Sequence, residues 1–125
     1  MPELMECQHW EPGAETADCH LCPWQCHVKV DQVGICQVRK NVGGTLRSLN
    51  YGRVTSIGVD PIEKKPLYHF FPGSTILSLG TFGCNLSCAF CQNWQISKGT
   101  PPSDEVPPEQ AARMAEQYQT SDGNL

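Results

Sequence analysis

The chain has 125 residues, a formal net charge of −4 and a sequence pI near 5.4, with 39% hydrophobic and 18% charged residues. A chain of this size can hold one modest domain or the leading part of a larger one. The acidic balance provides no electrostatic footprint for nucleic acid or for an anionic membrane, so we expect neither as a partner.

The cysteine content indicates the compartment. Eight cysteines among 125 residues fall below the ~8–10% typical of a secreted disulfide scaffold. Residues 1–10 show no basic region followed by an apolar core, and no stretch approaches the ~20 apolar residues of a membrane helix. We therefore expect a cytoplasmic protein, in which cysteine clusters more often bind metal than form disulfides.

The first part of the chain predicts a small metal-organised module and a hairpin. Residues 1–44 carry five of the eight cysteines and little hydrophobic periodicity, which is typical of a cysteine-rich metal-binding module. Residues 34–40 and 45–51 are predicted strands of a β-hairpin with its turn at residues 41–44. A third strand is expected over residues 53–59, before a proline-punctuated segment at 60–73. Residues 45–73 are thus predicted to be a β-strand and proline-rich connector.

The remaining residues, 74–125, predict one βα unit. Residues 74–79 read as a short buried strand, and residues 99–108 as an exposed loop. Pro108 suits the first position of a helix that Gly123 would cap. The predicted buried stripe of this helix consists of Ala111, Met114, Ala115 and Tyr118. A further strand would begin at Asn124, so we expect an α/β chain whose βα unit is truncated.

Cys84, Cys88 and Cys91 form the pattern Cys-x3-Cys-x2-Cys, with Phe90 directly before the last cysteine. Iron–sulfur cubes are usually held by four cysteines, so three thiolates leave one iron open to a substrate or cofactor. The same spacing also describes one face of a helix, on which the cysteines would be a core stripe. Gly83 and Asn85 disfavour a packed helix at this position.

This motif resembles the signature of the radical SAM superfamily, Cys-x3-Cys-x-aromatic-Cys. The resemblance implies a partial TIM-type barrel and a [4Fe-4S] cluster on Cys84, Cys88 and Cys91 that binds S-adenosylmethionine. It also implies that the reduced cluster cleaves this cofactor to a 5′-deoxyadenosyl radical, which abstracts hydrogen from the substrate. Phe90 would pack near the adenine, and a flavodoxin or ferredoxin would be the reductant.

Three longer stretches narrow the resemblance: residues 60–70, 72–74 and 91–94. They are similar to the radical SAM enzyme of the AmmeMemoRadiSam system, which is related to the pyruvate formate-lyase activating enzyme. The similarity covers residues 19–97 and leaves the substrate open between a protein and a small molecule. It places the glycine-rich contact to S-adenosylmethionine in later strands, so we expect the chain alone to be inactive.

Cys19, Cys22, Cys26 and Cys36 form the second cysteine group, which the same resemblance covers. Four cysteines can close a tetrahedral zinc site or hold a second iron–sulfur cluster, and their spacing does not choose between the two. Two neighbouring histidines could replace a thiol as ligand, but we favour the interpretation that they are flanking surface histidines. These histidines are His20 and His27. Cys7 lies outside both groups and is expected to be a free thiol.

Two other classes of protein remain compatible with these cysteines. A small iron–sulfur electron carrier would use both groups, but carriers shield their irons with four ligands and the second group has three. A zinc-ribbon binding module would hold zinc without iron. In the connector, Lys64 and Lys65 could contact an anionic ligand or form a solvated turn.

Overall fold

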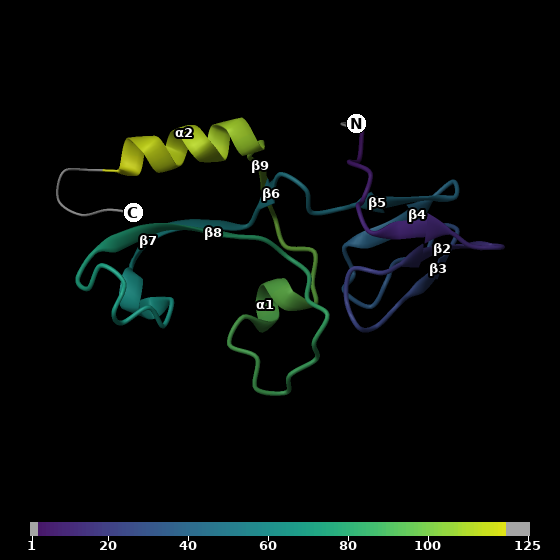
Figure 1. Cartoon of the computed structure of the whole chain (residues 1–125), viewed down its shortest axis with the longest axis horizontal. Coiled ribbons are helices and arrows are strands. Elements are labelled where there is room, and N and C mark those ends of the chain that lie inside the picture. The colour runs from purple at the N-terminus through teal and green to yellow at the C-terminus, as the bar shows by residue number, and fades with distance from the viewer. Residues whose placement is uncertain (1–2, 120–125) are drawn as a thin grey trace. The chain divides into compact units, whose positions relative to one another are not determined.

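A computed structural model describes residues 3–119 of the chain (Figure 1). Its strands form antiparallel pairs. The chain divides into two compact units, each built from two segments. We call residues 1–51 with 82–101 the cysteine unit, since it contains all eight cysteines, and residues 52–81 with 102–125 the hairpin unit. These units do not follow the predicted boundaries after residues 44 and 73, because one β-hairpin spans the first of them.

The cysteine unit contains a three-stranded sheet and a hairpin. Strands β1 (Trp10–Pro12), β2 (Thr16–Cys19) and β3 (His27–Lys29) pair antiparallel in the order β1-β2-β3. Strands β4 (Arg39–Val42) and β5 (Thr45–Ser48) form the hairpin, whose two-residue turn is Gly43-Gly44. Both glycines have positive φ, 59° and 92°, as a tight hairpin turn requires. The hairpin is confirmed, whereas the three-stranded sheet was not predicted, because its strands are too short for alternation to be visible.

The core of the cysteine unit lies between these strands. Its buried members are Cys7, Ala17, Cys19, Val28 and Leu46. The fully buried Asn41 side chain donates to the Val28 carbonyl oxygen at 2.8 Å and accepts from the Gly44 backbone N–H at 2.9 Å. Since both ends of this amide are hydrogen-bonded, its burial carries little cost and ties the hairpin turn to β3.

The predicted strand over residues 34–40 is wrong for its first five residues. Gln37 donates its backbone N–H to the Gly34 carbonyl oxygen at 2.9 Å and has a φ of 66°. This tight turn contains Cys36, so the strand begins only at Arg39. Tertiary contacts override the weak strand preference of the segment.

The hairpin unit is built on β7 (Ser56–Pro61) paired with β8 (Thr75–Gly80). The short η1 helix (Ile62–Lys64) follows β7, and Ile62 is fully buried. Residues 60–73 therefore connect two paired strands. Two short strands, β6 (Arg53–Val54) and β9 (Asp104–Glu105), also pair, so the predicted strand over residues 53–59 is interrupted and the predicted loop over residues 99–108 contains a strand.

Burial in the hairpin unit is lower than the sequence predicts. The strand predicted at 74–79 is confirmed as β8, but the side chains of β8 are at most half-buried and Leu79 is exposed, while Ser74 directly before it is buried. Helix α2 (Pro108–Tyr118) begins at Pro108 as predicted, yet Ala111 and Met114 are half-buried and Ala115 and Tyr118 are exposed. Two-stranded sheets offer too little apolar surface to bury a whole helical stripe. The predicted cap Gly123 and strand start Asn124 lie outside the described residues.

All the strand pairs in residues 3–119 are antiparallel. The order of strand β8, cysteine loop and helix follows the predicted βα unit, and helix α1 (Trp94–Ser97) comes directly after the loop. Because a barrel of βα units is recognised by parallel neighbours, the partial barrel stays a prediction. None of the helices in the described part of the chain has the length and apolar character needed to cross a bilayer.

Candidate functional site

Cys84, Cys88 and Cys91 lie in an irregular segment, which we call the cysteine loop (residues 82–93). The Phe82 side chain is buried, and its carbonyl oxygen accepts a hydrogen bond from Asn50 Nδ2 at 3.0 Å. Gly83 donates its N–H to the Ile96 carbonyl oxygen of α1 at 2.9 Å. The loop is thus held at its start, and the alternative of a helical core stripe is wrong.

The three thiols of the loop line one pocket of about 260 Å³. Cys84 and Cys91 are half-buried and Cys88 is exposed. Cys84 Sγ accepts the Leu86 N–H at 3.4 Å, and Cys91 Sγ lies 3.7 Å from Ser97 Oγ. The donor chemistry fits an iron–sulfur cluster, because three thiols share one cavity and a backbone N–H already points at sulfur.

Lys98 is a pocket residue that sequence reasoning missed. Of the described residues lining the loop pocket, it alone carries a charge, and its Nζ donates to the Cys84 carbonyl oxygen at 2.9 Å. A lone lysine after a motif carries no sequence signal of its own. Trp94 also lines the pocket, and its position in Cys-Gln-Asn-Trp was the available clue.

Phe90, the predicted adenine contact, projects into solvent. It is 90% exposed, the highest value among the large hydrophobic side chains described. Phe90 does not line the loop pocket, but its exposed ring is available to a ligand. Its contact with adenine stays a prediction.

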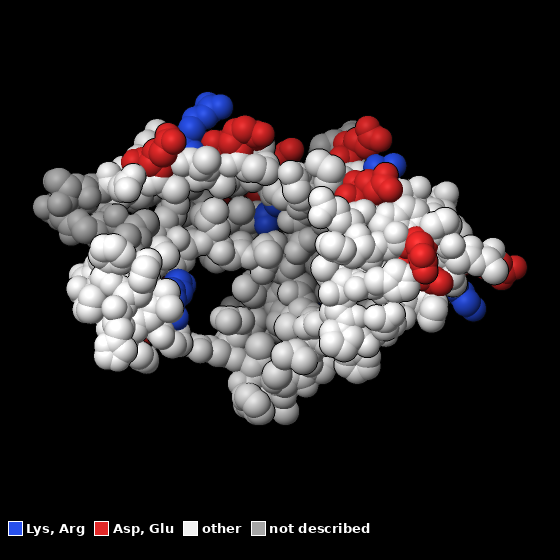
Figure 2. All heavy atoms as spheres, in the orientation of Figure 1, with Lys and Arg blue, Asp and Glu red and all other residues white. Residues whose placement is uncertain are grey.

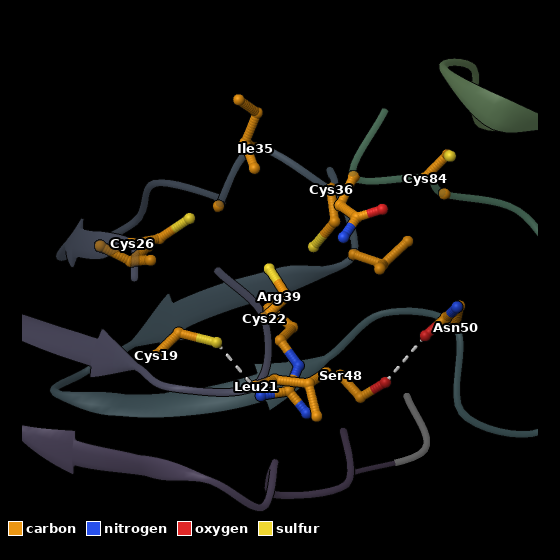
Figure 3. Close-up of a pocket in the computed structure, with 15 residues that line it drawn as sticks. Cys19, Leu21, Cys22, Cys26, Ile35, Cys36, Arg39, Ser48, Asn50 and Cys84 are labelled. Carbon is orange, nitrogen blue, oxygen red and sulfur yellow. Dashed lines mark hydrogen bonds between the residues drawn. The ribbon is translucent and has the colours of Figure 1, made fainter. Parts of the chain in front are cut away.

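Cys19, Cys22, Cys26 and Cys36 line a second cavity of about 440 Å³, which we call the thiol pocket. Their sulfur atoms face a common space in Figure 3, while the sulfur of Cys84, at the edge of the same pocket, is directed away from it. The structure therefore brings together the four cysteines that the sequence grouped. It also brings them to the start of the cysteine loop, which the sequence did not indicate.

Coordination distances are not met in either place: within residues 3–119, no three His, Cys, Asp or Glu side chains are grouped closely enough to hold a metal ion. The chemistry of the thiol pocket nevertheless suits a soft metal, since its lining contains four neighbouring thiols and no carboxylate or imidazole. Binding would have to draw the thiols inward, as is common where metal binding and folding are coupled.

Arg39 provides the positive charge of the thiol pocket. Its Nη1 donates to Cys19 Sγ at 3.3 Å and to the Gln8 carbonyl oxygen at 2.9 Å. Of the described residues lining the pocket, no other is charged.

The two histidines beside the thiol pocket have other partners. His20 lies 3.0 Å from Glu11 Oε1 and 3.2 Å from Gln25 Oε1, and these hydrogen bonds, with Gln25 the larger cause, raise the pKa of His20. His27 Nδ1 lies 2.9 Å from Asp18 Oδ1. Neither histidine lines the pocket, which favours the interpretation of flanking surface residues.

Three further residues named from the sequence lie outside both pockets. Cys7 is a free thiol in the core, and burial raises its pKa. Lys64 Nζ and Lys65 Nζ both donate to the Asp60 carboxylate, at 2.7 and 3.2 Å. The two lysines therefore fasten a turn, as the solvated-turn alternative expected.

Charge is dispersed over the face drawn in Figure 2. There, acidic and basic side chains form small separate groups among uncharged atoms, without a broad field of either sign. The absence of a nucleic-acid partner stays a prediction.

Comparison with known proteins identifies two relatives from Methanocaldococcus jannaschii. The chain is 45% identical over 103 residues to the uncharacterized protein MJ0808. This alignment covers 80% of the chain and 31% of the length of MJ0808. It is 32% identical over 82 residues to the uncharacterized protein MJ0674, covering 65% of this chain and 19% of that relative. The chain thus spans less than a third of either relative. No family model matches the chain, and no solved structure matches it.

Proposed function

We propose that this chain is the cluster-binding part of a radical SAM enzyme, with Cys84, Cys88 and Cys91 as the ligands of a [4Fe-4S] cluster. The observation that carries the proposal is that these three thiols line one pocket within an irregular loop. A fourth thiol is absent from the described lining of that pocket, which favours an open iron over the closed cluster of an electron carrier.

The loop residues have distinct roles in this proposal. The Leu86 N–H hydrogen-bonds to Cys84 Sγ, and such bonds to sulfur raise the reduction potential of a cluster. Lys98 contributes a positive charge that suits the carboxylate of S-adenosylmethionine. Phe90 is free to stack on an adenine. Cys84, Cys88 and Cys91 would hold the cluster, which would supply the electron for reductive cleavage of S-adenosylmethionine and so allow hydrogen abstraction from a protein or small-molecule substrate.

The proposed class is that of the glycyl-radical-enzyme activating enzymes and their relatives, with flavodoxin or ferredoxin as reductant. The whole enzyme would act in the cytoplasm. The chain spans 31% of MJ0808, so we assign substrate turnover to a longer protein. We expect the 125-residue chain to bind the cluster but not to convert a substrate.

Anaerobic reconstitution tests this function. The chain is loaded with iron and sulfide, reduced with dithionite, and its electron paramagnetic resonance spectrum is recorded with and without S-adenosylmethionine. An open iron should change its spectrum when the cofactor is added, and Cys88→Ser should remove the signal. Ser87→Ala is the matched control, because it changes a neighbouring pocket residue that is not a thiol.

Activity is tested in the full-length M. jannaschii relative that is 45% identical to the chain. Formation of 5′-deoxyadenosine under reducing conditions is the expected result. If S-adenosylmethionine does not change the spectrum of the cluster and no 5′-deoxyadenosine forms, the proposal of a radical SAM enzyme is wrong and an electron carrier is favoured.

A further inference from the structure

The thiol pocket is assembled by two tight turns and one strand pair. Cys19 donates its backbone N–H to the Cys26 carbonyl oxygen at 2.8 Å, which places these cysteines opposite each other beside β2 and β3. The first turn runs from Cys22 to Gln25, with an N–H to carbonyl distance of 3.2 Å and a Gln25 φ of 47°. The second turn, described above, presents Cys36. Thiols on two tight turns are a common arrangement for a tetrahedral metal site.

Electrostatics favour a metal ion in this pocket over four free thiols. A divalent ion with four thiolates has a net charge of −2, and the Arg39 guanidinium 3.3 Å from Cys19 Sγ partly offsets it. The described lining offers no hard oxygen anion, so Mg²⁺ and Ca²⁺ are disfavoured and Zn²⁺ is preferred.

The same pocket is joined to the start of the cysteine loop. Trp24, which lies between Cys22 and Cys26, donates its indole N–H to the Asn85 carbonyl oxygen at 2.9 Å. Gly83 packs directly against the Cys36 turn: a Cβ there would overlap Val38 Cγ1 and lie 3.0 Å from the Cys36 carbonyl oxygen. Both turns of the thiol pocket therefore touch the residues that flank Cys84.

We infer that Cys19, Cys22, Cys26 and Cys36 bind one structural zinc ion, and that this site clamps the Cys84 end of the cysteine loop through Trp24 and Gly83. Metal binding pulls the two turns together, and the turns hold the backbone of residues 83–85. The inference does not require the loop to carry an iron–sulfur cluster, because its contacts to the loop are to backbone and not to the loop thiols.

Zinc binding is tested in the full chain carrying C84S, C88S and C91S, so that the loop thiols cannot contribute. The protein is stripped of metal under reducing conditions and titrated with zinc chloride against a chromophoric chelator. We expect one zinc ion per chain. Adding Cys22→Ser or Cys36→Ser removes a thiolate ligand and should weaken zinc binding by more than the about 10–100-fold that loss of an outer-sphere partner costs. Cys7→Ala is the control, since Cys7 is a cysteine outside the pocket, and it should retain zinc.

Cobalt substitution tests directly whether thiolates coordinate the metal ion. The triple-serine chain loaded with Co²⁺ should show an intense thiolate-to-cobalt charge-transfer band. Lack of zinc binding by the reduced protein, or lack of this band, would overturn the inference. An iron–sulfur chromophore in the triple-serine chain would overturn the choice of zinc.

The clamp is tested by hydrogen exchange of residues 83–86 with and without zinc. Zinc should slow exchange at these amides in the triple-serine chain. Trp24→Phe retains the aromatic ring but removes the indole N–H, so it should reduce this protection while the zinc stoichiometry stays at one. Zinc-independent exchange at residues 83–86, or full protection in Trp24→Phe, would overturn the clamp and leave only a separate zinc site.

Discussion

The thiol pocket and the cysteine loop belong to the same unit and differ in how they are built. The thiol pocket has four grouped cysteines, strand neighbours and an arginine that hydrogen-bonds to one thiol. The cysteine loop has three cysteines, no regular secondary structure before α1, and Cys88 in contact with solvent. Four thiols on a scaffold suit a closed structural ion, whereas three on an exposed loop leave a coordination position for a ligand. The two groups of thiols within one unit therefore differ in number, in exposure and in their charged neighbours.

The largest expected effect is the complete loss of iron binding at the cysteine loop. Cys88→Ser should abolish iron loading at the cysteine loop, since two thiols cannot hold a cubane, while zinc in the thiol pocket stays unchanged. Metal analysis for both elements on one sample measures this. Simultaneous loss of iron and zinc would show that the sites are not separate.

Gly83→Ala should break the link between the sites. Gly83 has a φ of 94°, and an added Cβ would meet the Cys36 turn. We expect a loss of about 2–4 kcal/mol in the free energy of unfolding, from backbone strain and overpacking combined. Urea unfolding followed by tryptophan fluorescence measures it.

Gly43→Ala is the matched control for Gly83→Ala. Gly43 has a φ of 59° with open space around its Cβ position, so this variant carries strain without a clash. It should cost about 1 kcal/mol. Equal costs in the two variants would contradict the packing of Gly83 against the Cys36 turn.

Arg39→Met should act on the thiol pocket, and it also removes the hydrogen bond to the Gln8 carbonyl oxygen. Removing its charge and its bond to Cys19 Sγ should weaken zinc binding about 10–100-fold, the usual effect of an outer-sphere partner. Arg113→Met in α2 is a control for the loss of one surface charge. Competition with a chelator measures both variants, and unchanged binding in Arg39→Met would argue against a role for its charge.

The smallest effect is a pH dependence outside both sites. Hydrogen bonds from Lys64 and Lys65, the first being the larger cause, lower the pKa of Asp60 to about 2. Because the folded-state pKa lies below the ordinary value of 3.8, this contribution to stability is present above that value and is lost as the pH falls toward 2.

Acid unfolding tests the pairing of Asp60 with the two lysines. Unfolding measured from pH 5 to 2 should show a shallower acid limb for Asp60→Asn than for the exposed Asp104→Asn. Identical limbs would contradict the pairing of Asp60 with the lysines.

Local signals predicted much of the chain. The glycine pair at 43–44 identified the hairpin, and Pro108 identified the first turn of α2. The hydrophobic pattern did not predict secondary structure where contacts between distant residues determine it. Residues 34–38 have strand-like composition but form the Cys36 turn, and the short strands β1, β2 and β3 show no period that a sequence window can detect.

Both groups of cysteines could be predicted from their spacing, because spacing is a local property of the chain. The proximity of the two groups in space could not be predicted from the sequence. Trp24 and Asn85 are 61 positions apart, and only folding brings the indole N–H to that carbonyl oxygen. Lys98 and Arg39 enter their pockets in the same way, as single charges without a motif around them.

Thus the sequence alone specifies which thiols belong together and the chemistry that three or four of them suit. The tertiary structure decides that the thiol pocket adjoins the start of the cysteine loop, that Arg39 faces one pocket and Lys98 the other, and that Phe90 is left exposed. The physical reason is that ligand type and spacing are encoded within a few consecutive residues. Proximity, charge compensation and burial depend on long-range packing that no short segment contains.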